Sequence, residues 1–200
     1  MPDYLDRLSR FVCETRLEDL ESSTVNAAKS VVLDTIGAML AGSRLSENVE
    51  LARFAAKTGG QGPATLLGQP GSAIAVFAAL SNATAGVALE MDEGNRLGGG
   101  HAAIHVIPAA LAVAEERGAT GRQFLESVIA GYEVTSRIGT GTKVRKSVHS
   151  HGTWGTIGSA VATAKLMGFD EARTTEAINV SASMSPANTW APCIEGATIR

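Results

Sequence analysis

The sequence predicts an all-α fold, and three observations support this prediction. Apolar residues recur at helical spacing in one segment after another, and no run alternates with a period of two for long enough to build a sheet. Alanine is abundant and glycine contributes 22 of the 200 residues, whereas aromatic residues make up only 4%. Because small side chains let helices approach closely, we expect tightly packed helices with few large core residues.

Composition and charge narrow the classes of function. The formal net charge is -3, and no cluster of Lys and Arg indicates a surface for nucleic acid or membrane lipid. The N-terminal segment is charged throughout and lacks the apolar core of a signal peptide. The two cysteines, Cys13 and Cys193, form neither a disulfide framework nor a metal-ligand pair. We therefore expect a cytoplasmic protein that binds neither nucleic acid nor membrane.

The first half of the chain contains three segments that we expect to be helical. SSTVNAAKSVVLDTIGAMLAGS (22–43) repeats apolar residues at helical spacing. SENVELARFAAKTGG (46–60) predicts a shorter helix capped by Ser46. SAIAVFAALSNATAGVALEM (72–91) is apolar on nearly every side, which predicts a buried central helix. Before it, GPATLLGQPGS (62–72) is turn-rich, with room for a short strand.

Residues typical of helix ends mark the second half of the chain. PAALAVAEERG (108–118) should begin at Pro108, because proline is favoured in the first turn of a helix. Thr120 opens a capping box in front of the helical segment FLESVIAGYEVTSRIG. GTWGTIGSAVATAKLMG (152–168) predicts a helix of small residues, and Asp170 caps the helix that follows it.

The first candidate site follows the apolar segment and joins acidic residues to a pair of histidines. Its members are Glu90, Asp92, Glu93, Asn95, His101 and His105. Carboxylates at the C-terminal end of a helix face the negative end of its dipole, which suggests that they serve a function. They could orient a histidine or bind a substrate hydroxyl. The alternative is a solvated loop whose acids face water.

His101 and His105 have the H-x-x-x-H spacing that can hold a metal ion on a helix. We do not expect a metal site, because Pro108 should set the start of the following helix and leave both rings on a loop. The glutamate of a zinc-protease motif is also missing after His101. We therefore predict neither a metal nor another cofactor. The alternative is a metal site formed by histidines, and a metal assay on the purified protein distinguishes the two.

A second histidine pair, His149 and His151, stands directly before a glycine-rich helix. Exposed N–H groups at a helix start attract anions, and a protonated imidazole adds positive charge. Gly155 and Gly158 allow either close packing of helices or close approach of a ligand. The alternative is one surface histidine and one core histidine beside a tight helix crossing.

At these residues the sequence resembles the MmgE/PrpD family, which includes 2-methylcitrate dehydratase, cis-aconitate decarboxylase and iminodisuccinate epimerase. VVLDTIGAMLAGS resembles the family's N-terminal helix, and NATAGVALEMDEGN resembles its N-G-x-x-x-x-x-L-D-F-D-D segment. HAAIHVIPAALAVAEE resembles H-P-x-x-x-V-x-P-A-A-L-A-L-A-E. HSHGTWGTIGSAVATAKLMGFD resembles H-x-T-G-T-x-G-T-F-G-A-A-A-A-A-A-K-L-L-G-L. Four matches in the same order identify the chain as a member of this family.

The resemblance implies roles for individual residues. His101 and His149 match the family's two active-site histidines, and Glu90 and Asp92 occupy acidic positions of its D-x-D-D segment. We expect His101 to transfer a proton, while the two carboxylates orient it or a substrate hydroxyl. The predicted catalytic residues are His101, His149 and Asp92, and the predicted substrate-binding residues are Glu90, Asn95, His151 and Arg200.

Departures from the family pattern leave the substrate open. Ala102 replaces the usual proline, His151 replaces a threonine, and Val87 replaces a frequent histidine. Asn95 or its neighbour stands where a threonine is common. Arg200 lies where many members have a lysine; arginine can bind a carboxylate with two hydrogen bonds, but it cannot give up a proton near neutral pH.

The resemblance implies a cofactor-independent lyase or isomerase that acts on a small di- or tricarboxylate. Dehydration, decarboxylation and epimerisation all stay open, since each moves a proton next to a carboxylate. Residues 1–200 would be the helical N-terminal domain of a longer, homodimeric chain that adds a lid-like α+β domain. The rival hypothesis is an inactive dimerisation or scaffold fragment with an exposed apolar patch.

Overall fold

The computed structural model describes residues 3–186, 189 and 190, and this part of the chain is almost entirely helical. The predicted all-α fold is confirmed. The elements in chain order are α1 (Tyr4–Glu14), the 3₁₀ turn η1 (Leu17–Asp19), α2 (Ser22–Gly42), α3 (Ser46–Thr58), β1 (Ala64–Thr65), β2 (Ser72–Ala73), α4 (Ala75–Val87), α5 (Ala102–Arg117), α6 (Gly121–Gly141), α7 (His151–Leu166) and α8 (Glu171–Ser183). None of the helices in the described ranges is both long and apolar enough to cross a membrane.

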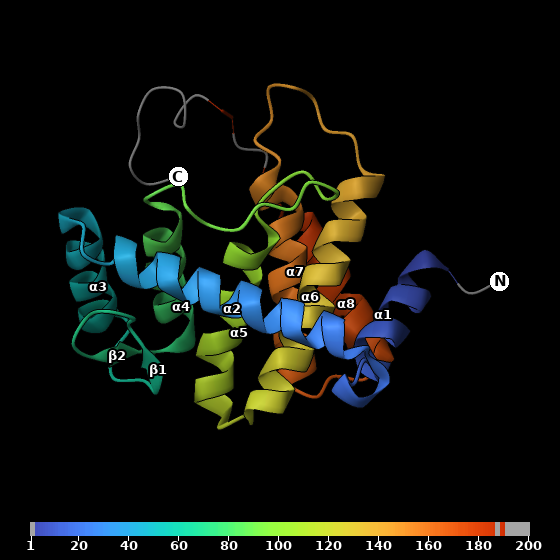
Figure 1. The fold of residues 1–200 in the computed structure, drawn as a ribbon, viewed down its shortest axis with the longest axis horizontal. Coiled ribbons are helices and arrows are strands. Elements are labelled where there is room, and N and C mark those ends of the chain that lie inside the picture. The colour runs from blue at the N-terminus through green and yellow to red at the C-terminus, as the bar shows by residue number, and fades with distance from the viewer. Residues whose placement is uncertain (1–2, 187–188, 191–200) are drawn as a thin grey trace.

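Helices α5, α6 and α7 form the centre of the molecule, and the other elements pack around them. α7 contacts α5, α6 and α8, and α1 packs on α8 at one end. α4 packs on α5, while α3 and the short antiparallel hairpin β1–β2 lie against α4 at the other end. In Figure 1, α2 runs across the helices α4, α5 and α6.

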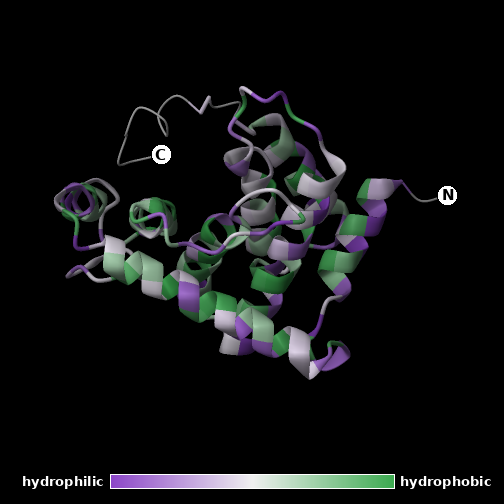
Figure 2. Ribbon diagram, turned by 45° about the horizontal axis from the view of Figure 1, so that its top comes forward, coloured by the Kyte–Doolittle hydropathy of each residue, from purple (hydrophilic) through white to green (hydrophobic). Residues whose placement is uncertain are grey.

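Three clusters of buried apolar side chains hold these helices together, and α5 contributes to two of them. The first joins α2, α5, α6 and α7 and contains Met39, Ala103, Ile104, Val106, Ile107, Ala110, Val128 and Ala162. The second joins α1, α6, α7 and α8 and contains Leu8, Val12, Ala130, Val134, Ile157, Val161 and Ile178. The third packs α3 and the hairpin on α4 and on Ala112 of α5. Figure 2 shows α1 banded with hydrophilic and hydrophobic residues, as expected for a helix that buries one face.

Glycines bring α6 and α7 into close contact, as the abundance of small residues predicts. A Cβ atom on Gly158 of α7 would lie 1.7 Å from Oγ1 of Thr135 and 2.8 Å from the carbonyl oxygen of Gly131, both on α6. Atoms cannot approach this closely, so only glycine fits at position 158. Of the two uses that the sequence leaves open for this glycine, the structure shows helix packing.

Several helix ends lie where the sequence places them. Thr120 and its capping-box partner exchange hydrogen bonds at the start of α6, and Asp170 accepts the Arg173 N–H at the start of α8. The short strand predicted within residues 62–72 is confirmed by the hairpin. Ser46 is not the predicted cap: it is the first residue of α3, and its hydroxyl contacts the Glu47 carboxylate.

The prediction for residues 72–91 is partly wrong, because one face of α4 is exposed. Val76 is 72% exposed and Leu80 is 49% exposed, one helical turn apart. The other faces of α4 pack on α2, α3 and α5, and nothing in the described ranges covers this one. Apolar residues on every side therefore do not mean burial on every side within this part of the chain.

The predicted start of the helix at Pro108 is wrong, since α5 begins six residues earlier at Ala102. Pro108 cannot donate to the Ile104 carbonyl, which costs about 3 kcal/mol inside a helix. The first turns nevertheless bury Ile104, Val106 and Ile107, none more than 2% exposed. Burial of each contributes about 1.5–3 kcal/mol, so packing outweighs the lost hydrogen bond. As a consequence, His105 lies on the helix and His101 is its N-cap residue.

Candidate active site

A pocket of about 110 Å³ lies where the connection from α4 to α5 meets the connection from α6 to α7. These are the green and orange loops at the top of Figure 1. The four histidines of the chain all line the pocket. Its complete lining is Val87, Glu90, Asp92, His101, Ile104, His105, His149, His151 and Trp190.

Three imidazole rings and one indole ring pack against one another in this pocket. The ring of His151 lies between the other two imidazoles, with its centroid 4.7 Å from that of His101 and 4.4 Å from that of His149. Trp190 packs edge-on against His149, at a centroid distance of 4.3 Å. Residues 101 and 149 are thus far apart in the sequence and close together in space.

Helices α5 and α7 run in the same direction, and both begin at the pocket. His101 at the start of α5 lies beside His151 at the start of α7. One turn further along, a Cβ atom on Gly155 of α7 would lie 2.3 Å from the ring of His105. Ser159 then donates a hydrogen bond to the His105 carbonyl at 2.7 Å. The N-terminal ends of both helices, which carry partial positive charge, therefore point to the same place.

Asp92 stabilises the positively charged form of His101. Oδ2 of Asp92 lies 3.1 Å from Nδ1 of His101, and the aspartate side chain is only 4% exposed. Neither atom has a well-aligned hydrogen-bond partner in the described part of the chain, so the two groups interact as a close ion pair. The Asp92 carboxylate outweighs burial and raises the pKa of His101 from 6.5 to about 9. His101 is therefore an imidazolium at neutral pH.

His105 and His151 are uncharged at neutral pH. Burial, with a smaller contribution from the neighbouring imidazoles, lowers the pKa of each from 6.5 to about 4. Gly155 leaves space for the His105 ring, and Gly100 leaves space for the ring of His151. An uncharged imidazole can donate one hydrogen bond and accept another, so these two rings can bind polar groups without adding charge.

Asn95 organises the loop in front of α5 rather than facing the pocket. Its side-chain oxygen accepts the Gly98 N–H at 2.7 Å, and its side-chain nitrogen donates to Oγ of Ser136 at 2.7 Å. Its backbone forms an isolated bridge to Gly100. Because both side-chain polar atoms are engaged, the structure supports a role in shaping the loop. Contact between Asn95 and substrate stays a prediction.

Glu90 lines the pocket with an unusual backbone conformation. Its φ is 53°, the only positive φ of a non-glycine residue in the described part of the chain. This left-handed conformation costs roughly 1 kcal/mol for a residue with a side chain, and such strain is concentrated at functional sites. The chain accepts it where α4 ends and the acidic segment turns toward α5.

The sequence thus identifies five residues that the structure brings into one pocket: Glu90, Asp92, His101, His149 and His151. Arg200 and Cys193 lie outside the described residues. Sequence reasoning missed Trp190, which no motif marks, and it placed His105 in the first candidate site without giving that residue a catalytic or substrate-binding role. Within the described ranges, no group of three or more His, Cys, Asp or Glu side chains is arranged to hold a metal ion.

The fold and the site define an all-helical domain with a histidine-lined pocket at the start of two parallel helices. This chain belongs to the MmgE/PrpD family: residues 6–191 match the MmgE/PrpD N-terminal domain. It is 24% identical, over 189 residues, to the cis-aconitate decarboxylase-like protein oryM of Aspergillus oryzae. That similarity covers 89% of this chain and 39% of the relative, so the chain spans about two fifths of the relative's length.

Proposed function

We propose that this chain supplies the histidine half of the active site of a lyase or isomerase that acts on a small di- or tricarboxylate. The observation that carries the proposal is the meeting of His101, His149 and His151 at the starts of α5 and α7. Membership of the MmgE/PrpD family and the decarboxylase-like relative support a lyase. No cofactor is required for the chemistry proposed below.

A substrate carboxylate would meet positive charge from the His101 imidazolium and from the N-terminal ends of α5 and α7. Of the two carboxylates in the lining, Asp92 pairs with His101, and we propose that Glu90 meets a substrate hydroxyl. With Nδ1 directed at Asp92, Nε2 is the ring nitrogen left for the substrate. A carboxylate at Nε2 would receive a charge-assisted hydrogen bond. A second carboxylate would need another cation, a role that the sequence assigns to Arg200.

We propose that two histidines share the proton transfer, one as acid and one as base. A carbon next to a carboxylate becomes more acidic when a cation stabilises the negative charge that develops, and His101 can supply this stabilisation and a proton. The pKa of His151, at about 4, makes its ring a weak base that suits hydrogen bonding to the substrate. His149 is our candidate for accepting the substrate proton. We propose that Asp92 orients His101 and that Glu90, which lines the pocket, contacts a substrate hydroxyl.

The test is exchange of carbon-bound hydrogen in heavy water, followed by NMR, with the protein in its full natural length. Citrate-like, aconitate-like and iminodisuccinate-like acids would be compared, because they separate dehydration, decarboxylation and epimerisation. His101→Gln should lower turnover by about a hundredfold or more. Glu133→Gln, an exposed change on α6 outside the pocket, is the control and should leave turnover unchanged. Turnover that survives in His101→Gln would refute the proposal.

A second candidate function is association through the exposed apolar residues of α2 and α4. Leu33 of α2 is 73% exposed and Val76 of α4 is 72% exposed. We propose that these exposed apolar side chains are buried against another part of the natural protein or against a second copy, as in the predicted homodimer. Sedimentation of the wild type and of Val76→Lys would measure it. Identical monomeric behaviour of both proteins would count against self-association.

A further inference from the structure

Glu93 joins the start of α5 to α6 through both oxygens of its carboxylate. One oxygen accepts the backbone N–H of Ala103 at 3.0 Å, and the other accepts the hydroxyl of Tyr132 at 2.5 Å. Ala103 is the second residue of α5 and is fully buried, so its N–H has no access to water. An unpaired buried N–H costs about 1–3 kcal/mol, and the Glu93 carboxylate removes this cost.

This arrangement does for α5 what the N-cap side chain does in most helices. A Ser, Thr, Asp or Asn at the N-cap usually accepts the N–H of the second or third helical residue. The N-cap of α5 is His101, whose side chain makes no capping hydrogen bond. Because Glu93 supplies the acceptor from the preceding loop, position 101 is free to direct an imidazole into the pocket.

We infer that Glu93 and Tyr132 are positioning residues that hold the His101 ring against Asp92. Glu93 is the direct neighbour of Asp92, so a fixed Glu93 side chain also fixes the carboxylate that pairs with His101. The backbone carbonyls at positions 93 and 92 lie close enough to His101 to favour its charged form. Asp92 therefore acts on the ring, and Glu93 acts on the helix and loop that carry it.

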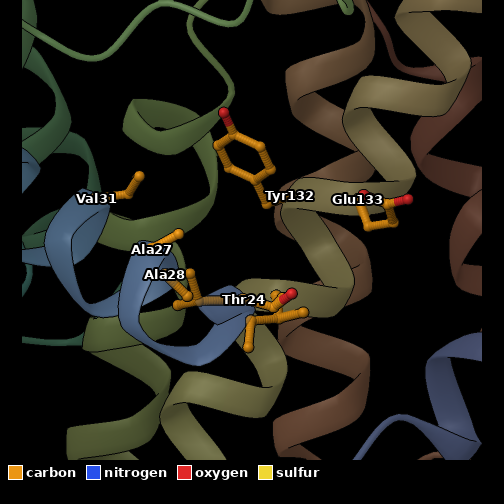
Figure 3. Close-up of a pocket in the computed structure, with 8 residues that line it drawn as sticks. Thr24, Ala27, Ala28, Val31, Tyr132 and Glu133 are labelled. Carbon is orange, nitrogen blue, oxygen red and sulfur yellow. The ribbon is translucent and has the colours of Figure 1, made fainter. Parts of the chain in front are cut away.

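Tyr132 anchors this assembly to α6. Its ring forms one wall of a cavity of about 270 Å³ between α2 and α6, opposite Ala27 and Ala28. Figure 3 shows its hydroxyl pointing away from these alanines. Burial and the hydrogen bond to Glu93 raise the pKa of Tyr132, so the hydroxyl keeps its proton and remains a donor. Since the cavity leaves one side of the ring loosely packed, the hydrogen bond is an important restraint on it.

The inference predicts a changed titration of His101, which NMR can follow through the imidazole C–H resonances. The titratable groups that share the pocket with His101 are Glu90, Asp92, His105, His149 and His151. Single-histidine substitutions assign the four imidazole signals. Glu93→Ala should shift the proton dissociation constant of His101 at least ~tenfold, toward an ordinary histidine. Tyr132→Phe should shift it in the same direction by less, because only the O–H···O bond is lost.

Conservative variants separate positioning from simple loss of charge. Glu93→Gln keeps an oxygen acceptor for the Ala103 N–H and should restore the wild-type titration of His101. Glu133→Gln removes a carboxylate from the residue that follows Tyr132 on α6, and it should leave the titration of His101 unchanged. If Glu93→Ala unfolds, Tyr132→Phe still tests the inference, since it preserves the ring. A His101 titration unchanged in a folded Glu93→Ala, or unchanged in Tyr132→Phe, would overturn it.

The relevance of these residues to catalysis rests on the proposed function, but the titration does not require turnover. In the active protein, Glu93→Ala should also move the pH profile of kcat along with the His101 titration, and Glu93→Gln should move neither. An enzyme that is inactive on every acid would sink the proposed function and leave the positioning result intact. The two failures can therefore be told apart.

Discussion

Replacing Asp92 by asparagine tests the electrostatics of the pocket most directly. Asparagine keeps the shape of the side chain but removes the charge that holds the proton on His101. In the native protein the pKa of His101 is raised from 6.5 to about 9. With the carboxylate gone, its two contributions are lost, so the pKa of His101 should fall from about 9 to near that of an ordinary histidine. At pH 7.5 the variant would then hold a neutral imidazole where the wild type holds a cation.

The size of the effect on stability follows from the same pKa. Each pH unit is worth about 1.4 kcal/mol, so a pKa raised from 6.5 to about 9 would correspond to about 3 kcal/mol for a fully buried pair. The His101 side chain is 33% exposed, and screening by water reduces this to about 1–2 kcal/mol. Because the folded-state pKa is raised, this stabilisation is complete below pH 6.5 and is lost as the pH rises through 9.

Thermal unfolding of both proteins at pH 6.0 and pH 9.5 measures the difference. For a chain of 200 residues, the loss of about 1–2 kcal/mol of stability in Asp92→Asn should lower its Tm by roughly 3–6 °C at pH 6.0. At pH 9.5 the difference in Tm between the two proteins should disappear. His101→Gln is the control, since it removes the titrating ring and should flatten the pH dependence. A gap of equal size at both pH values, or a His101 that still titrates near 9 in Asp92→Asn, would refute the electrostatic reasoning.

Three further predictions concern the packing of the helices and the loop in front of α5. Gly158→Ala should lower the free energy of unfolding in denaturant by about 3 kcal/mol, since its Cβ would lie 1.7 Å from Oγ1 of Thr135. Gly37→Ala, which has open space around it, should raise this free energy by about 0.5–1 kcal/mol. Similar values for the two variants would contradict the packing argument. Glu90→Gly should be about 1 kcal/mol more stable than Glu90→Ala, because only glycine adopts a φ of 53° freely, and equal stabilities would exclude strain at this position. Asn95→Ala should lower the unfolding free energy by about 1–2 kcal/mol; a changed KM at unchanged stability would instead place Asn95 against the substrate.

The predictions from sequence that hold are those that depend on neighbouring residues. The capping box at Thr120, the cap at Asp170 and the short strand within residues 62–72 are local features, and the structure has them where the sequence places them. The histidine pairs were recognisable because each stands before a glycine-rich or small-residue helix. Their meeting in one pocket follows from the parallel packing of α5 and α7, which local patterns do not encode.

The features that the sequence did not predict depend on contacts between distant segments. The start of α5 was misplaced because Pro108 is a local signal, whereas the burial that overrides it comes from α2, α6 and α7. The bond between Tyr132 and Glu93 joins residues 39 positions apart, so no motif marks it. The charge states of His101 and His105 could not be read from the sequence either, because they depend on which ring meets the buried carboxylate.

Both the close packing of α5 on α7 and the arrangement of the histidines in the pocket require a glycine at position 155. The parallel register of α5 and α7 places the ring of His105 against position 155, where any side chain would occupy the space of the imidazole. Displacing His105 would move α5 along α7 and separate His101 from His151 at the helix starts. Gly155 therefore preserves the histidine cluster without facing the substrate. The small residues that first suggested tight helix packing are, at this crossing, also what brings the imidazoles together.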